Sequence, residues 1–304
     1  MNAGSTNQNK IIGHNLGPDH ITIAVPNKGR LNKPALELLA NAGLHIIDES
    51  SRKLFARCTN PAVSILFARA SDIPEYVAMG AADLGMTGYD LICEKEANVE
   101  ILMDLSFGNA DLVLAVPEDM RIASVHQLDD KKVATSYPKI TKSFFTEKGV
   151  NVEIVEVSGA CEMTPHVGIA DAIVDLTSSG TTLKINRLQV IEHVLSSSVK
   201  LIANKDSSSH RGHIMDDVVM AFKSVIDARN KRYLMMNVPK DSLDEVKKIL
   251  PGMSGPTVMP VESSHNLVAV HAVIDETDIF RIITSLKRAG AKDILITPIE
   301  RLIH

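Results

Sequence analysis

Residues 21–30 have the sequence ITIAVPNKGR, and this stretch decides the fold class. The apolar run 21–25 predicts a buried strand, after which a loop leads to a helix that begins at Pro34 and ends near Gly43. Further apolar runs alternate with helical stretches; they are residues 64–68, 112–116, 132–135, 152–157, 172–174 and 199–203. This alternation predicts an α/β fold with mainly parallel sheet covered on both faces. Pro117 and the strand at Val199 mark the expected crossings between two lobes that enclose a cleft.

The pattern changes after residue 230, where strands 233–238, 257–261, 267–274 and 293–299 enclose two helices. The order β-α-β-β-α-β is typical of a ferredoxin-like module, a fold that often senses small ligands. Ser242 and Glu245 have the spacing of a capping box at the start of the first helix, which is expected to end at Pro251 and Gly252. The second helix carries one apolar face, formed by Ile279, Ile282, Ile283 and Leu286, and ends at Gly290.

Length and composition exclude several classes of protein. A chain of 304 residues with 45% hydrophobic and 23% charged residues predicts an ordinary globular protein of two or three compact units. The net charge of −5, without a basic stripe, argues against a nucleic-acid surface. Cys58, Cys93 and Cys161 form no C-x-x-C pair, so we expect buried thiols in a reducing cytoplasm. Residues 1–20 lack the features of a secretory signal and are expected to be a disordered tail, and no apolar run is long enough to span a membrane.

The segment 172–183, AIVDLTSSGTTL, predicts a phosphate site. An apolar strand ends at Asp175, and a loop of hydroxyl residues around Gly180 leads into a helix. Such a loop directs backbone N–H groups, hydroxyls and a helix dipole at one point, which suits a phosphate monoester, while Asp175 suits a ribose hydroxyl. The alternative is that these residues are turn formers and helix caps.

Two other segments are candidates for ligand binding. Lys28, Gly29 and Arg30 follow the first strand, where open α/β sheets bind ligands, although for this motif alone a solvated basic turn is the favoured explanation. The segment from Arg69 to Asp90 contains DLGMTGYD, in which glycines alternate with apolar residues. It predicts a strand whose edge approaches a flat group such as a base, or else a tight turn with helix caps.

The histidines do not suggest a metal site. His210 and His213 lie among serines without carboxylate or cysteine partners, so we expect a loop there. His166 and His271 are expected to be packed or at the surface.

Taken together, these segments resemble the ATP phosphoribosyltransferase family in its long form, from about residue 21 to residue 304. The family signature is matched by Glu162, Gly168, Ala170, Ile173, Asp175, Ser179, Gly180, Thr182 and Leu183. The resemblance implies a two-lobed core like that of periplasmic binding proteins and a C-terminal ferredoxin-like (ACT-like) regulatory domain. It implies lobe I at 21–115 with 200–230 returning to it, lobe II at 116–199 and the regulatory domain at 231–304. It also implies a homo-oligomer, either a dimer or a hexamer.

The family reaction joins N1 of the adenine of ATP to C1 of phosphoribosyl pyrophosphate and releases pyrophosphate, with Mg²⁺. The metal is expected to be carried by the substrate, with no side-chain ligand. By resemblance, the catalytic residues are Lys28, Arg30, Glu162 and Asp175. The phosphoribosyl pyrophosphate site is formed by Glu162, Asp175, Leu176, Thr177, Ser178, Ser179, Gly180, Thr181 and Thr182. ATP is bound by Gly29, Arg30, Arg69, Gly88 and Asp90. Histidine, the feedback inhibitor, is bound by Asn237, Thr257, Val273 and Asp293, and AMP is a possible second effector.

Two alternatives stay open. The first is a two-lobed small-molecule binding protein without catalysis, since the lobe pattern is the same. The second is another phosphoribosyltransferase; the common nucleotide-salvage enzymes usually carry two adjacent acidic residues before the phosphate loop, whereas Val174 precedes Asp175 here.

Overall fold

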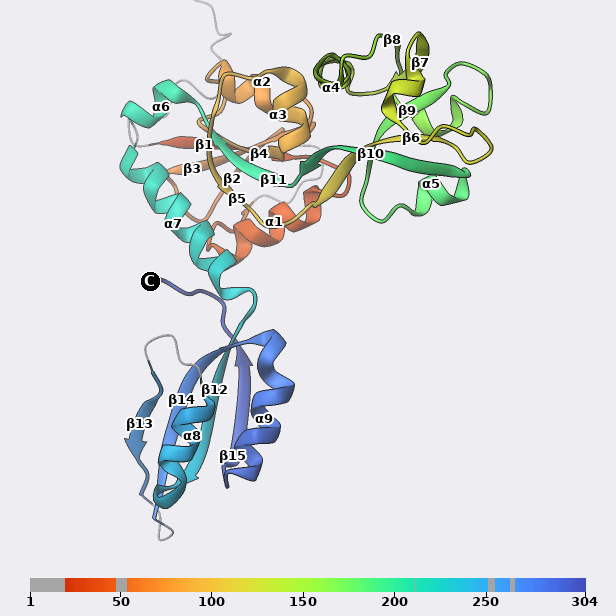
Figure 1. Ribbon diagram of the computed structural model, residues 1–304. Helices are drawn as coiled ribbons and strands as arrows, with labels where there is room; N and C mark the ends of the chain where they lie inside the picture. The colour runs from red at the N-terminus through yellow and green to blue at the C-terminus, as the bar shows by residue number, and fades with distance from the viewer. Residues whose placement is uncertain (1–19, 48–53, 211, 251–254, 263–265) are drawn as a thin grey trace, which may run out of the picture. The chain divides into compact units, whose positions relative to one another are not determined.

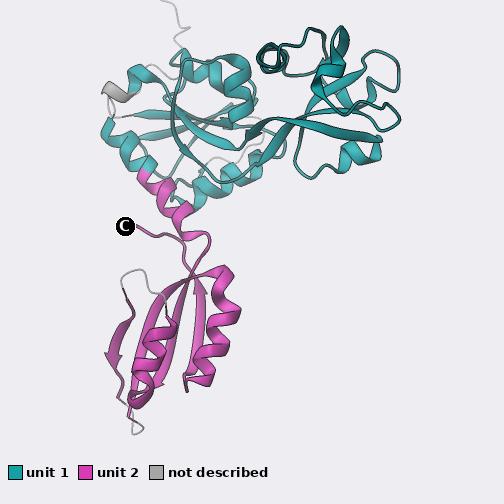
Figure 2. Ribbon diagram, viewed as in Figure 1, with its two compact units in different colours: residues 1–219 teal, residues 220–304 magenta. Residues whose placement is uncertain are grey.

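The computed structural model describes residues 20–47, 54–210, 212–250, 255–262 and 266–304 (Figure 1). The chain divides into two compact units, residues 1–219 and residues 220–304 (Figure 2). The division falls inside helix α7, Gly212–Ala228, upstream of residue 231, where the sequence pattern changes. The expected tail, apart from His20, and the expected helix end at Pro251 and Gly252 lie outside the described residues.

The first unit contains a six-stranded sheet with the order β2-β3-β1-β4-β11-β5. Its strands are β1 (Ile21–Pro26), β2 (Phe55–Arg57), β3 (Val63–Ala68), β4 (Leu84–Gly88), β5 (Glu100–Asp104) and β11 (Val199–Ala203). Its helices are α1 (Asn32–Asn41), α2 (Ile73–Ala78) and α3 (Tyr89–Lys95). Every residue of β1 is buried, which confirms the strand expected from the apolar run.

A second sheet in the same unit has the order β10-β6-β9-β7-β8. Its strands are β6 (Ala110–Pro117), β7 (Lys131–Thr135), β8 (Val152–Glu156), β9 (Ala172–Thr177) and β10 (Leu188–Ser197), and its helices are α4 (Pro138–Lys148) and α5 (Thr181–Ile185). Phe145 packs into the core beneath β6 and β9. The two sheets form the two α/β lobes of the core.

The expectation of mainly parallel sheets is wrong, because both sheets are mixed. In the first sheet β1 is parallel to β3 and β4, but β11 is antiparallel to β4 and β5. In the second sheet β7 is parallel to β8 and β9, but β6 is antiparallel to β9 and β10. The antiparallel strands β6 and β11 adjoin the crossings between the lobes. They enter their sheets without a β-α-β connection, so nothing forces them to be parallel.

The chain crosses to the second lobe before Pro117, which ends β6 within the second sheet. The crossing instead lies between Asp104 and Ala110, and the chain returns at Ser198, next to the predicted position. Strand β10 was not expected from the sequence. Two register irregularities interrupt it and break the two-residue alternation that reveals a strand.

Residues 205–210 and 212–213 are helical rather than a loop. Helix α6 is Lys205–His210, and α7 follows it from Gly212. The Asn204 carboxamide oxygen accepts hydrogen bonds from the N–H groups of Asp206 and Ser207, both at 3.0 Å. This cap allows a serine-rich segment to begin a helix.

The second unit contains an antiparallel sheet with the order β13-β14-β12-β15. Its strands are β12 (Lys231–Pro239), β13 (Thr257–Pro260), β14 (Leu267–Asp275) and β15 (Lys292–Pro298), and its helices are α8 (Leu243–Ile249) and α9 (Ile279–Arg288). The expected β-α-β-β-α-β order is confirmed. Ile282 and Leu286 of α9 are buried in the core of this unit. The capping box is wrong, because Ser242 has helical backbone angles, whereas a capping side chain needs an extended backbone.

Candidate active site

The carboxyl ends of β1 and β3 lie next to each other and place basic residues at one edge of the first sheet. Pro26 pairs with Ala68, and the Asn27 N–H donates to the Ala68 carbonyl at 2.7 Å. Lys28, Gly29 and Arg30 are exposed in the loop after β1, and Arg69 is exposed directly after β3. Gly29 has a φ of 79°, a left-handed conformation that other residues rarely adopt. Lys28 and Arg30 of one loop and Arg69, which is distant from them in sequence, therefore collect at the edge where α/β sheets bind ligands.

The hydroxyl-rich loop lies between β9 and α5. The Gly180 N–H donates to the Thr177 hydroxyl at 2.9 Å, and Gly180 has a φ of 70° in open space. Ser178, Ser179, Thr181 and Thr182 are exposed. The loop is thus closed by a hydrogen bond from its own backbone to the Thr177 side chain, and it presents its other hydroxyls to solvent.

The basic loop and the hydroxyl-rich loop meet across the two lobes. The Arg30 guanidinium donates a hydrogen bond to Ser178 Oγ at 2.5 Å, although the two residues are 148 positions apart. An anion held by the hydroxyl-rich loop would therefore lie within reach of a fixed positive charge from the other lobe.

Two carboxylates adjoin this loop. Asp175, the fourth residue of β9, is half-buried, and its carboxylate accepts a hydrogen bond from the Leu176 N–H at 2.8 Å. Burial raises the pKa of Asp175 above its ordinary value, and the negative charge of Glu162 adds to the increase, against the lowering effect of the Leu176 N–H. Two like charges held close together favour a ligand that supplies hydroxyl donors or a positive charge.

Cys161 lies beside the same carboxylates and is inert. Burial raises its pKa to about 12, and the charges of Asp175 and Glu162 contribute. The thiol donates to the Ala134 carbonyl at 3.3 Å. Cys58 is also buried, as expected, but Cys93 is only partly buried.

The glycines of β4 do not open the strand edge to a flat ligand, which corrects the prediction. Strand β4 is internal, between β1 and β11. A Cβ on Gly85 would lie 2.6 Å from Ile73 Cγ2, and a Cβ on Gly88 would lie 2.2 Å from Asp90 Oδ1. The space beside both glycines is therefore filled by side chains of the protein itself.

Tyr137 is a residue of the site that sequence reasoning missed. Its hydroxyl donates to Asp90 Oδ2 at 3.0 Å, so the second lobe contacts the first. Burial raises the pKa of Tyr137 well above its usual range, the charges of Asp90 and Asp175 raise it further, and the charge of Arg30 opposes them. Tyr137 therefore remains a protonated donor among three residues of the predicted site. Its position just after β7 was the available signal, because β7 runs parallel to β9.

Asp90 itself is buried, with 4% of its surface exposed. Its second oxygen, Oδ1, accepts from Ser197 Oγ at 2.5 Å, and its N–H donates to the same hydroxyl at 3.1 Å. Asp90 thus links helix α3 to the end of β10 and to Tyr137.

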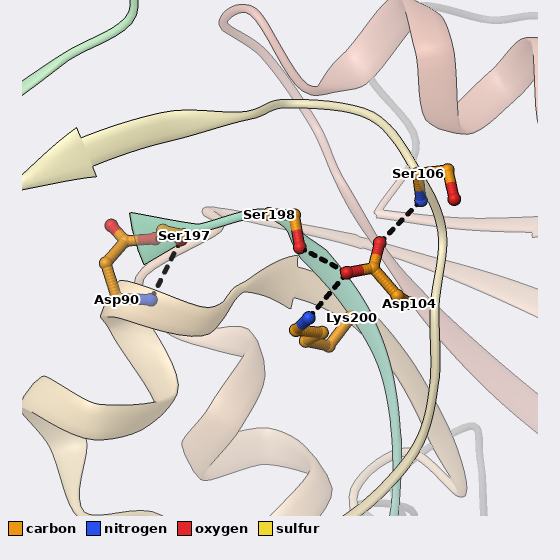
Figure 3. A network of polar contacts seen from close by, with 6 residues as sticks. All are labelled: Asp90, Asp104, Ser106, Ser197, Ser198 and Lys200. Atoms are coloured by element: carbon orange, nitrogen blue, oxygen red, sulfur yellow. Dashed lines mark hydrogen bonds and ion pairs between the residues drawn. The ribbon is translucent and has the colours of Figure 1, made fainter. Parts of the chain in front are cut away.

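The two crossing segments between the lobes are joined by Asp104 (Figure 3). Its carboxylate accepts hydrogen bonds from the Ser106 N–H at 2.7 Å, from Ser198 Oγ at 2.6 Å and from Lys200 Nζ at 2.6 Å. Burial alone would raise the pKa of Asp104, but these donors outweigh it and lower the pKa. An open pocket of about 420 Å³ adjoins this network and is lined by Asp104, Asn109, Ala110, Asp111, Ser178, Ser196, Ser197, Ser198 and Lys200.

A serine, a histidine and an aspartate meet near this pocket but cannot act as a hydrolytic triad. His193 Nε2 lies 3.0 Å from Ser196 Oγ and 3.1 Å from Asp111 Oδ1. A triad needs the serine and the aspartate on opposite ring nitrogens, whereas here both contact the same one. Elsewhere, His166 Nε2 lies 2.7 Å from the Asn186 carbonyl oxygen and His271 Nδ1 lies 2.7 Å from the Tyr233 hydroxyl.

The predicted effector residues are only partly brought together. Asn237 Nδ2 donates to Asp293 Oδ2 at 2.9 Å, between β12 and β15. Thr257 is exposed on β13, at the opposite edge of the sheet, where it pairs with His271. Val273 lies on β14 and pairs with Tyr233 of β12. Because neighbouring strands are about 4.8 Å apart, Thr257 and Asp293 of one chain cannot both contact one small amino acid.

The two α/β lobes are joined by two crossing segments, and the basic loop of one meets the hydroxyl-rich loop of the other. This arrangement defines a two-lobed α/β protein of the ligand-binding class. The family model described as ATP phosphoribosyltransferase matches residues 69–224, and the model described as HisG, C-terminal domain, matches residues 228–301. The chain belongs to the ATP phosphoribosyltransferase family, and the protein is therefore a transferase.

Individual relatives agree with this assignment. ATP phosphoribosyltransferase of Methanosarcina mazei is 58% identical over 93% of this chain and 99% of the relative. The protein of the same name from Natronomonas pharaonis is 58% identical over 92% and 99%. A solved structure, the ATP phosphoribosyl transferase (HisG:HisZ) complex from Thermotoga maritima, is 27% identical with a TM-score of 0.61 and covers 68% of this chain and 98% of its own. The predicted two-lobed core with a C-terminal domain is confirmed. In the described part of the chain, no helix has the length and apolar character needed to cross a membrane.

Proposed function

We propose that the protein joins N1 of the adenine of ATP to C1 of phosphoribosyl pyrophosphate and releases pyrophosphate. The observation that supports this most directly is the hydrogen bond between Arg30 and Ser178. It places a cation of one lobe at the hydroxyl-rich loop of the other, which is the arrangement that a substrate with phosphate groups at both ends of a ribose requires.

The chemistry requires alignment and charge stabilisation more than a base. Adenine N1 is unprotonated at neutral pH and attacks C1 as the bond to pyrophosphate breaks, so positive charge develops on the sugar and negative charge on pyrophosphate. In this proposal the loop from Thr177 to Thr182 holds the 5-phosphate. Glu162 and Asp175 hold the ribose hydroxyls, and their charge favours the developing cation. Lys28 and Arg30 stabilise the departing pyrophosphate.

ATP is proposed to bind at the edge formed by Gly29, Arg30, Arg69 and Asp90; Gly88 offers no open space there, because Asp90 fills the position beside it. Arg69 is exposed beside the basic loop and can reach a phosphate. Both oxygens of Asp90 already accept a hydrogen bond from the protein. Each carboxylate oxygen has a second lone pair, so Asp90 can still accept from the amino group of an adenine.

Mg²⁺ is part of the proposal as an ion carried by the diphosphate. Mg²⁺ keeps several waters and commonly takes only one or two carboxylates together with substrate phosphates. Among the described residues, His, Cys, Asp and Glu form no group of three or more that could hold a metal. When bound, the ion would neutralise part of the negative charge of the diphosphate. Glu162 and Asp175 are the carboxylates that would balance the positive charge of the ion.

Regulation is proposed to reside in residues 231–304, with catalysis between the lobe that contains the first sheet and the lobe that contains the second sheet. Histidine is the expected inhibitor, and AMP is a possible second effector. The protein is proposed to act as a homo-oligomer, either a dimer or a hexamer, in the cytoplasm. The Asn237–Asp293 pair is the polar group at one sheet edge that suits the amine of a free amino acid.

Mass spectrometry of the small molecules tests the function. The protein, ATP, phosphoribosyl pyrophosphate and Mg²⁺ should yield an adduct of ATP with the phosphoribosyl group and one equivalent of pyrophosphate. Omission of either substrate is the control. A binding protein would return both ligands unchanged, and transfer to a free base instead of ATP would indicate another phosphoribosyltransferase.

A further inference from the structure

Helix α4 of the second lobe lacks a capping residue of its own. Its N-cap residue is Tyr137, whose side chain makes no capping hydrogen bond. The first turn of a helix leaves backbone N–H groups without helical partners, and a serine, threonine or aspartate at the N-cap normally satisfies them. The start of α4 therefore needs acceptors from elsewhere.

The N–H groups at this terminus can be accounted for one by one. The Tyr137 N–H donates to Thr135 Oγ1 at 2.9 Å, and Pro138 has no N–H. The Thr141 N–H makes the first helical bond, to the Tyr137 carbonyl at 3.0 Å. The remaining groups are the N–H of Lys139 and of Ile140.

Both remaining N–H groups are satisfied by one carboxylate of the first lobe. Glu94 on α3 accepts from the Lys139 N–H through Oε1 at 3.0 Å and from the Ile140 N–H through Oε2 at 3.1 Å. A carboxylate at this end also interacts favourably with the positive end of the helix dipole. The N-terminus of α4 is therefore completed by the other lobe.

Glu94 acts next to the predicted site through Tyr137. Asp90 and Glu94 are four residues apart on α3, so they lie on the same helix face. Asp90 accepts from the Tyr137 hydroxyl at 3.0 Å while Glu94 caps the two backbone groups that follow Pro138. Tyr137 in turn lies within the electrostatic influence of Asp175 and Arg30.

We propose that Glu94 is a positioning residue, which caps α4 across the two lobes, holds the lobes in the closed arrangement and sets Tyr137 against Asp90 beside the bound substrates. The proposal rests on the proposed transfer reaction for its effect on turnover, but not for its effect on lobe closure. Glu96 supplies a matched control, because it also reaches α4, as an exposed ion pair with Lys139 without any contact to the helix backbone. Exposed pairs of this kind contribute little.

Lobe closure is measured in the full-length protein by pulsed electron resonance between spin labels. Labels are placed at the exposed positions Met79 and Lys131, one on each lobe, after both are replaced by cysteine in a Cys93→Ser background. Glu94→Ala should lengthen and broaden the distance distribution, Glu94→Gln should have a smaller effect because its amide keeps one acceptor oxygen, and Glu96→Gln should match the parent. A parent-like distribution for Glu94→Ala would overturn the proposal.

Turnover supplies the second measurement. Glu94→Ala should lower kcat by roughly 10- to 100-fold, with a smaller change in KM, because misplaced groups at the site slow the chemical step. Glu94→Gln should recover part of the loss, and Glu96→Gln should stay within about twofold. An unchanged kcat in a variant whose lobes separate would reject the positioning role. If the parent protein forms no adduct, the transfer reaction fails, and the distances still decide whether Glu94 holds the lobes together.

Discussion

Arg30 and Ser178 are hydrogen-bonded at 2.5 Å, although one follows the first strand of the first lobe and the other follows β9 of the second. The contact is made at an exposed position, where a hydrogen bond alone adds little to stability. The contact matters for position, because it holds the permanent positive charge of Arg30 beside the hydroxyl-rich loop.

Arg30→Ala should impair turnover more than substrate binding, because its proposed role is to stabilise charge that develops on the departing pyrophosphate. We expect kcat to fall by about 10²-fold, the size of effect seen when one such donor is lost. Steady-state kinetics with both substrates measure it. A raised KM with unchanged kcat would contradict the assignment.

Thr182→Val keeps the shape of the side chain and removes one hydroxyl. The Thr182 carbonyl, which accepts from the Asn186 side chain at 2.9 Å, is unaffected, so the first turn of α5 should persist. Loss of a hydrogen bond to a charged oxygen costs about 1.5–3 kcal/mol, so phosphoribosyl pyrophosphate should bind roughly 10- to 100-fold more weakly. Calorimetry should show little change for ATP; equal weakening of both substrates would mean that the loop has another role.

Tyr137→Phe removes the hydroxyl that reaches Asp90 and leaves the cap by Glu94 in place. We expect kcat/KM to fall roughly 10-fold, since a donor to a carboxylate beside the site is lost. The unfolding temperature should also fall, because Oδ2 of the buried Asp90 loses the Tyr137 donor, while Ser197 donates only to Oδ1. Activity equal to that of the parent would show that this contact is incidental.

Asp175→Asn should raise the stability of the ligand-free protein at neutral pH. The folded pKa of Asp175 is raised, so this group favours the folded state below its unfolded pKa, and that contribution is lost as the pH rises through the folded pKa. The variant should therefore melt roughly 1–3 °C above the parent near pH 7, and the difference should shrink towards pH 4.

Glu118→Gln, at an exposed position, is the control and should show no such trend. A difference that grows towards acid pH would reverse the sign and reject the argument. Catalysis should nevertheless be lost, because buried charge at active sites is retained for function.

Asp293→Asn and Thr257→Leu should separate histidine binding from the inhibition of turnover in the proposed effector response. Asp293 is the expected amine partner, so its replacement should weaken histidine binding by at least roughly 10-fold in calorimetry. Because Thr257 lies at the opposite edge of the sheet from Asp293, Thr257→Leu should abolish inhibition only if a second chain of the proposed homo-oligomer brings its β13 to the effector; basal activity should be kept, because the effector influences turnover only through a global equilibrium. Full inhibition of both variants by histidine would exclude these positions. Collapse of basal activity in Thr257→Leu would indicate a structural role for β13.

Local sequence determined the elements and the kind of each lobe. The apolar run at the start of the first lobe forms β1, and the order of elements after residue 230 matches the second unit, because both signals depend on the periodicity of neighbouring residues. The sequence also indicated that Gly29 and Gly180 lie in loops that follow strands, and the structure adds that both have a left-handed φ.

Tertiary structure alone decided which distant groups meet. The antiparallel entry of β6 and β11 and the irregular pairing of β10 depend on partners that no local pattern encodes. The same holds for the space beside Gly88, which Asp90 fills, and for the start of α4, which Glu94 caps from the other lobe. A helix terminus requires an acceptor but does not specify its source, so the sequence around Tyr137 leaves that acceptor undefined, and only the folded chain supplies it.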